Sequence, residues 1–380
     1  MFTRSIDIMK YLLSLSFLLI NIAGSFSQTS DDLNLLVSNN TINQSQADSL
    51  RAGAAFLQQQ KDNSGKSFLV SAARQIQLSG YSHIRFQSFE ESGKKDGFDI
   101  RRARLDLRGN VTHWFLYRIQ ADLAEKPKMI DAYGEIKLTD YLLITAGQFK
   151  IPFSMENLVS SSKLEMIDRS QAVEALVARG KDVIGNQNGR DIGVQMSGAF
   201  FKIKDHPFIE YSVGVFNGSG INISDTANAA KDIAGRLVFT PLKGLSIGGS
   251  FYNGWDKAIR PDIPGKSQVR NRTGVELNYV TSRCSLKGEY ISGKDAKTDI
   301  AGWYIQSGYF IIPLKFQIVG KYDTYDPNIS VSDNVSTKYV FGGNFNFNNW
   351  SRLQAFYTIR HEEGPAVENN YFSIQYQIGF

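Results

Sequence analysis

Apolar and polar residues alternate along the end of the chain. Phe372, Ile374, Tyr376, Ile378 and Phe380 occupy every second position, and Ser, Gln and Gly residues lie between them. A period of two predicts a β-strand with one apolar and one polar face. A strand with lipid outside and water inside needs this pattern, and a last strand that ends on an aromatic residue is typical of an outer-membrane barrel. We expect the outer-membrane assembly machinery to bind this strand through its end at Phe380.

The same alternation recurs between residues 75 and 380, in sixteen segments separated by turn-rich stretches. Single-chain bacterial barrels have even strand numbers, and a barrel of this size can enclose an aqueous lumen. Short connections such as residues 139–140 predict periplasmic turns, and longer polar ones predict extracellular loops. We therefore predict an all-β fold, a 16-stranded antiparallel transmembrane β-barrel over residues 75–380. The segments centre on residues 76–88, 98–109, 114–123, 129–138, 142–151, 190–201, 208–217, 232–240, 244–255, 268–280, 283–293, 299–311, 314–324, 337–347, 351–361 and 370–380.

The N-terminal part of the chain does not alternate. An apolar run over residues 11–22, preceded by Lys10 and followed by small residues, predicts a signal peptide over residues 1–27. Met9 is an alternative start. Residues 28–74 contain two stretches with helical spacing and then a polar linker, so we expect a short helical periplasmic segment before the barrel.

Composition excludes several other classes of protein. Without residues 1–27 the chain has 40 basic and 36 acidic residues, a net charge of +4, and no basic-aromatic module, so we expect no nucleic-acid partner. Cys284 is the only cysteine, which rules out an intramolecular disulfide and a cysteine-based metal site. We expect no cofactor. Because the chain is expected to be exported and its strands each have one apolar face, we predict that it lies in the outer membrane, where lipid surrounds the barrel.

Residues 152–189 form the longest connection between predicted strands. Residues 164–179 within it have the apolar spacing of a helix. A connection of this length is usually either functional or disordered. We interpret it as a constriction loop that folds into the barrel, and an external flap remains the alternative.

The alternation also assigns charged residues to the two faces of each strand. A charge at the bilayer midplane costs about 2–4 kcal/mol, so charged positions should face the lumen. In the fifth segment this places Gln148 and Lys150 inside and Phe149 and Ile151 outside. Inward basic residues outnumber inward acids, which favours anions in the lumen. Pairing with acids on neighbouring strands is the alternative role of each arginine. The inward basic residues of the first five segments are Arg85, Arg102, Arg104, Arg108, Arg118, Lys137 and Lys150.

Several motifs resemble the phosphate-selective porin O/P family, with a leader like that of Bacteroidetes-type members. They are FDIRRARLDLRG at residues 98–109, DAY at 131–133, AGQFKIPFS at 146–154, NGRDIGV at 188–194 and GVFNG at 214–218. The resemblance implies a barrel of sixteen strands, usually trimeric, with a constriction shaped by an inward loop. It implies passage of small anions such as phosphate or polyphosphate past basic side chains.

When the family's binding residues are carried over to the matching positions of this chain, the resemblance implies two sets of anion-binding residues. Arg102, Arg104, Arg108 and Arg118 would line the wall, and Lys163, Arg169, Arg179 and Lys181 would lie on the constriction loop. The loop also carries acidic residues, so it departs from a purely basic pattern. They are Glu156, Glu165, Asp168, Glu174 and Asp182.

Three kinds of protein compete with a passive porin: an enzyme, a non-conducting structural or receptor barrel, and a soluble secreted sandwich. The lipid-type face of the strands and the terminal aromatic residue argue against the sandwich. Catalysis would need a histidine beside a nucleophile or an acid, and no signature surrounds His83, His113, His206 or His361. We therefore predict that the protein is not an enzyme. A general, non-selective porin and a plugged structural or receptor barrel remain as alternatives.

Overall fold

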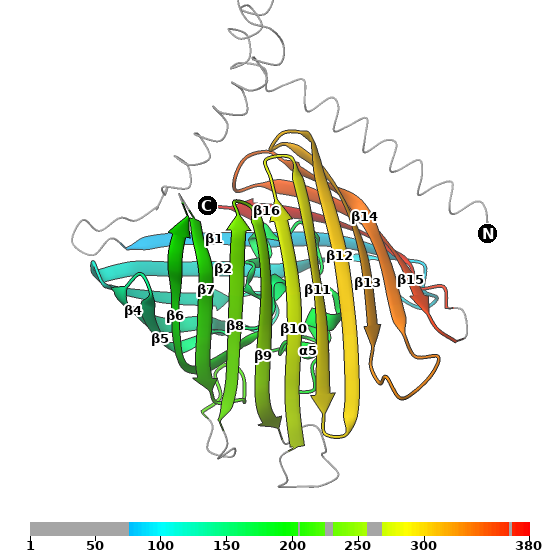
Figure 1. Cartoon of the computed structure of the whole chain (residues 1–380). Coiled ribbons are helices and arrows are strands. Elements are labelled where there is room, and N and C mark those ends of the chain that lie inside the picture. The colour runs from blue at the N-terminus through cyan, green and yellow to red at the C-terminus, as the bar shows by residue number, and fades with distance from the viewer. Residues whose placement is uncertain (1–75, 204–205, 225–230, 257–267, 365–366) are drawn as a thin grey trace, which may run out of the picture. The chain divides into compact units, whose positions relative to one another are not determined.

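The fold is a closed barrel. The computed structural model describes residues 76–203, 206–224, 231–256, 268–364 and 367–380. Sixteen antiparallel strands follow one another in sequence order, and β1 pairs with β16 to close the barrel (Figure 1). The predicted fold class and all sixteen strands are confirmed. The strands are β1 (Gln77–Phe89), β2 (Gly97–Thr112), β3 (Phe115–Asp122), β4 (Lys128–Thr139), β5 (Leu142–Lys150), β6 (Arg190–Ile203), β7 (His206–Phe216), β8 (Asp232–Leu242), β9 (Leu245–Asp256), β10 (Gln268–Val280), β11 (Cys284–Asp295), β12 (Thr298–Ile312), β13 (Phe316–Asp326), β14 (Ser336–Asn346), β15 (Arg352–Glu362) and β16 (Tyr371–Gly379).

The expected signal peptide and helical leader, residues 1–27 and 28–74, lie outside the described residues. Within the described ranges, no helix has the length and apolar character needed to cross a bilayer.

Side chains sort between the two faces of the barrel as a membrane requires. Ile119 and Ile318 are exposed on the outer face, whereas Gln120 and Gln317, their neighbours in sequence, are buried on the inner face. The outer face therefore offers apolar side chains to lipid, and the inner face is polar.

The alternation breaks at two places on the inner face. In β2, His83 pairs with Arg102 and Ile84 pairs with Ile100, so Arg101 is an extra residue in the ladder, a β-bulge. The bulge lets both Arg101 and Arg102 face the lumen.

The second break lies in β5 and corrects the expectation that Phe149 and Ile151 face lipid. Both side chains are buried within the barrel, and the ring centroid of Phe149 lies 5.6 Å from that of Phe216. Gly147 has φ of 127°, a value that side-chain-bearing residues rarely adopt. Thr145 and Phe149 line the same lumenal cavity, four residues apart, and Lys150 lines it as well, so the alternation is lost only after Phe149, where the chain leaves the wall for the loop.

Residues 151–189 enter the barrel and pack against its inner wall. They contain α4 (Met155–Leu158), a 3-10 helix η1 (Ser161–Lys163) and α5 (Gln171–Leu176). The predicted helix over residues 164–179 is therefore mostly wrong, because only α5 is helical. The carbonyl of Glu165 accepts hydrogen bonds from Asn344 and Gln354, at 2.9 and 3.2 Å, instead of bonding within a helix. Ser170 caps the start of α5 by accepting from the backbone N–H of Val173 at 3.4 Å.

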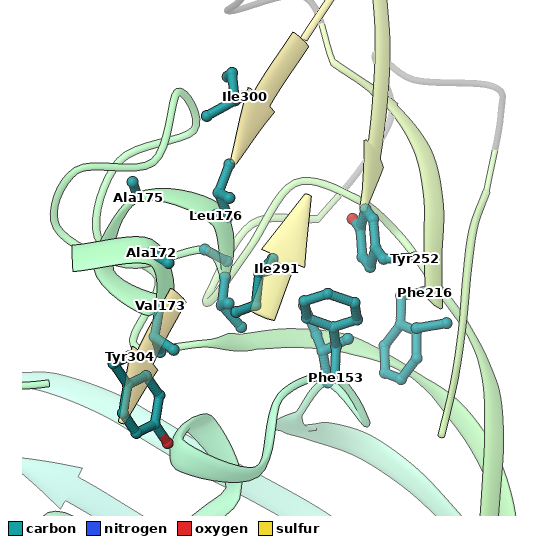
Figure 2. Packing of buried hydrophobic residues seen from close by; sticks show 14 of the residues in the cluster. Phe153, Ala172, Val173, Ala175, Leu176, Phe216, Tyr252, Ile291, Ile300 and Tyr304 are labelled. Atoms are coloured by element: carbon teal, nitrogen blue, oxygen red, sulfur yellow. The ribbon is translucent and has the colours of Figure 1, made fainter. Parts of the chain in front are cut away.

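A hydrophobic core fills the space between this loop and one side of the wall (Figure 2). Val173 and Leu176 of α5 and Phe153 lie against Ile291 of β11 and other wall residues, all almost fully buried. Glycines make room for the helix: a Cβ on Gly302 would lie 2.9 Å from Ala172 Cβ. Apolar packing thus covers the inner wall from β5 to β12 at this level, and a polar cavity remains along β2 and its neighbours. The wall residues of the core are Phe149, Phe216, Ala234, Tyr252, Ile291, Ile300 and Tyr304.

Candidate functional site: a basic cavity between loop and wall

Carboxylates of the wall fix the backbone of the loop. The Glu289 carboxylate accepts hydrogen bonds from the N–H groups of Met155 and Glu156 at 3.0 and 2.7 Å. The Asp323 carboxylate accepts from the N–H of Gln171 at 2.9 Å. Burying these amides without partners would be costly, so the acids stabilise the helix starts inside the barrel.

Buried ion pairs add to this attachment. Lys321 Nζ lies 2.9 Å from Glu156, and Arg270 lies 2.8 Å from Asp182. Lys287 lies 3.0 Å from Glu165. Asp168 pairs with Arg101 of β2, so four of the five loop acids neutralise basic residues of the wall, and Glu174 is the exception among the described residues.

A cavity of about 330 Å³ remains between the loop and the β2 side of the wall. Seven basic and four acidic side chains line it, which leaves an excess of three positive charges. The loop forms one side of this cavity, and the barrel wall forms the other. The basic residues are Arg101, Arg102, Lys128, Arg169, Arg179, Lys181 and Lys338, and the acids are Asp122, Glu125, Asp168 and Glu174.

Four of the predicted arginines are paired with acids. Arg85 lies 2.6 Å from Asp99, and Arg104 lies 2.9 Å from Asp122. Arg108 and Arg118 share Asp106, at 2.7 and 2.9 Å. Pairing across neighbouring strands was the alternative role expected for these arginines. Three aspartates therefore balance most of the charge of these four residues.

Lys137 also has an acid beside it, Asp140 at 2.7 Å. The other predicted residues have no acid within ion-pair distance among the described residues; they are Arg102, Lys150, Lys163, Arg169, Arg179 and Lys181. Arg102 donates no side-chain hydrogen bond within that part of the chain, and it lines the cavity with Arg169, Arg179 and Lys181. Lys163 is exposed and does not line this cavity.

Three of these unpaired cations do bind neutral acceptors. Arg169 donates to the carbonyls of Glu156 and Val159, and Arg179 donates to Asn157 Oδ1 at 2.6 Å. Lys150 donates to the carbonyls of Leu158 and Val159, each at 2.9 Å. Carbonyl oxygens hold these groups in place without cancelling their charge.

Two arginines of the loop have a lowered pKa, because they are buried and lie close to other cations. Burial lowers the pKa of Arg169 to about 10, although Glu156 and Glu174 act against the shift. Burial and the nearby Arg169 also lower the pKa of Arg179. A guanidinium keeps its proton under such conditions, so an anion placed between these groups would relieve the repulsion.

Sequence reasoning missed Arg101. Its guanidinium donates to the Asp168 carboxylate and to the carbonyl of Ile167, which ties the loop to β2. Burial raises the pKa of Asp168, but the positive charges of Arg101 and Arg85 outweigh burial and hold that pKa below its usual range. Strict alternation places Arg101 on the outer face. The sequence signal for a bulge is the RRAR run at residues 101–104, because a regular strand would turn one of two adjacent arginines toward lipid.

His83 lies beside an amide side chain of β16. His83 is buried, and its Nε2 lies 3.0 Å from Gln377 Oε1. The described residues contain no cluster of His, Cys, Asp and Glu side chains that could hold a metal ion.

Fold and site together define a porin: a closed barrel of sixteen strands with a loop packed against its inner wall. The sequence matches the family described as phosphate-selective porin O and P over residues 76–254 and 262–377, and the chain belongs to this family. It is therefore an outer-membrane porin, and family and fold point to a channel rather than an enzyme. No curated protein matches the sequence.

Solved porins share the fold at low sequence identity. The anion-selective porin from Comamonas acidovorans has a TM-score of 0.61 and 12% identity, and the match covers 81% of this chain and 100% of that one. OmpT of Vibrio cholerae, in a trimer form, has a TM-score of 0.56 and 11% identity, with 81% and 100% covered. A mutant of the Rh. blastica porin has a TM-score of 0.56 and 10% identity, with 80% and 100% covered.

Proposed function

We propose that the protein conducts small anions across the outer membrane, with a preference for anions over cations that is set in the cavity between the loop and β2. The observation that carries the proposal is the set of unpaired cations there: Arg102, Arg169, Arg179 and Lys181 line the cavity without an acid at ion-pair distance among the described residues. Fixed cations in a narrow lumen attract anions and repel cations.

The family description and the anion selectivity of the Comamonas acidovorans porin support the same proposal. The pairing pattern narrows it to particular residues. Because Arg104, Arg108 and Arg118 are each within 2.9 Å of an aspartate, selectivity should depend mainly on Arg102 and on the loop cations.

The double substitution Arg102→Gln with Arg179→Gln should therefore reduce the chloride-over-potassium preference severalfold. Glutamine retains hydrogen-bonding capacity and removes the charge. The measurement is the reversal potential of purified protein in a planar bilayer under a KCl gradient.

A matched control removes two charges elsewhere. Lys202→Gln with Lys297→Gln changes exposed lysines that do not line the cavity, so its reversal potential should equal that of the wild type. Unchanged selectivity in the Arg102 and Arg179 variant would show that these residues do not set it. Absence of any conductance in the wild type would instead support a plugged barrel, because the loop occupies so much of the lumen.

We also propose that the porin is a homotrimer. The support is the trimer form of OmpT, which shares the fold. Unheated protein should migrate on a denaturing gel near three times its monomer mass and collapse to the monomer on boiling. Migration as a monomer under mild detergent, confirmed by light scattering, would contradict this proposal.

A further inference from the structure

The size of the cavity is the first indication of what it binds. Its volume of about 330 Å³ reaches the range of small-molecule sites, which begins at about 300 Å³. An inorganic anion would leave most of this space to water. The cavity therefore has room for an organic body attached to the anionic group.

The donors that are available lie together at one place. Arg102 has no side-chain hydrogen bond among the described residues, and Arg179 uses only Nε and one terminal nitrogen, both for Asn157. Arg102, Arg169 and Arg179 all line this one cavity. Planar guanidinium groups match the oxygens of a phosphate.

The same cavity contains acceptors that a site for a bare anion would not need. Glu174 has no basic partner at ion-pair distance among the described residues, and one of its oxygens accepts only the N–H of Gly180, at 3.3 Å. Asp168 binds Arg101 and Arg85 through Oδ1, and no described residue donates to Oδ2. Its side chain is 38% exposed. Carboxylate oxygens beside the cations weaken the binding of a bare anion and offer acceptors to hydroxyl groups.

From these donors and acceptors we infer that the cavity selects phosphorylated polyols, with the phosphate at Arg102 and Arg179 and the hydroxyl groups at Glu174 and Asp168. This inference rests on the anion-conducting function proposed above. The excess of three positive charges among the lining residues favours a net anion over a zwitterion such as an amino acid.

The test compares two phosphate monoesters of equal charge, glycerophosphate and methyl phosphate, as blockers of the chloride current through single channels. They differ mainly in the hydroxyl groups. One hydrogen bond to a charged group is worth about tenfold in affinity. Glycerophosphate should therefore block at a concentration about tenfold lower than methyl phosphate does, with glycerol and glycine causing no block.

The substitution Glu174→Gln tests whether the Glu174 carboxylate accepts the hydrogen bonds of the ligand's hydroxyl groups. Glutamine keeps an oxygen for the N–H of Gly180 and removes the charge, so the loop stays in place. The preference for glycerophosphate should fall toward parity, and methyl phosphate should block at a lower concentration than in the wild type. The matched control is Glu135→Gln, which changes a carboxylate that lines a separate lumenal cavity of about 210 Å³ and should leave the ratio unchanged.

Each outcome separates the two proposals. Equal block by the two monoesters in a channel that prefers chloride overturns the polyol inference and leaves the anion porin standing. A preference for glycerophosphate that survives Glu174→Gln overturns the role of Glu174. A potassium preference with no block by either monoester overturns both proposals.

Discussion

A channel without residues 153–187 should conduct severalfold more current than the wild type and lose most of its preference for anions. The excision is geometrically simple, because the loop leaves and re-enters the wall at one place: Ile151 N–H donates to the carbonyl of Gly189 at 3.1 Å. A two-glycine link between Pro152 and Asn188 would close the gap as a short hairpin. Conductance rises because the lumen widens, and selectivity falls because Arg169, Arg179 and Lys181 leave with the loop.

The excision changes both the width of the lumen and its charge, so a control must change the charge alone. Arg169→Gln, Arg179→Gln and Lys181→Gln together keep the loop and remove its cavity-lining cations. This variant should lose selectivity and keep a conductance near that of the wild type. Heat-modifiable gel mobility would show that both barrels are folded, since the excision uncovers Phe216, Tyr252 and Ile291 on the inner wall. A folded, excised channel with wild-type conductance would show that the loop does not limit the current.

The barrel could be predicted from the sequence because its pattern is local. Alternation with a period of two is imposed on every strand by lipid on one side and water on the other, and short turns mark the ends. All sixteen segments were found for this reason. Two residues were placed on the wrong face for different reasons. The bulge at Arg101 shifts the alternation by one residue, which alternation alone does not reveal. Phe149 is apolar and was therefore placed toward lipid, whereas it packs inside the barrel in the core that the loop forms with the wall.

The loop and its cavity were much harder to predict, because their contacts join distant parts of the chain. Lys321 and Glu156 are 165 positions apart, and Asp323 binds Gln171 over 152 positions. Composition indicated that the lumen is basic, but it could not show which arginines are paired. Arg102 and Arg104 look alike in the RRAR run, and only the position of Asp122 beside Arg104 separates a structural arginine from an available one.

The pair of Arg270 and Asp182 is the attachment whose loss should destabilise the loop most. The nitrogen and oxygen atoms are 2.8 Å apart, and the two side chains are 2% and 0% exposed. Asp182 also accepts the N–H of Ala178 at 2.7 Å, so one carboxylate fixes both the wall and the turn after α5. Asp182→Ala leaves the Arg270 charge buried without its partner, a change that costs about 3–5 kcal/mol. We expect a lower midpoint of guanidinium unfolding, followed by tryptophan fluorescence, and open-channel noise from a loosened loop.

A double-mutant cycle shows whether the pair itself causes the loss. Arg270→Met with Asp182→Ala removes both charges, and the combined loss should be smaller than the sum of the two single losses, since neither partner is then left buried alone. Asp299→Ala is the matched control, because its pair with Lys294 spans 3.6 Å and both side chains are more than half exposed. That change should cost about 0–1 kcal/mol. Additive losses in the cycle would mean that the two residues stabilise the loop independently, Asp182 through the backbone of the turn and Arg270 through its contact with the ring of Tyr252.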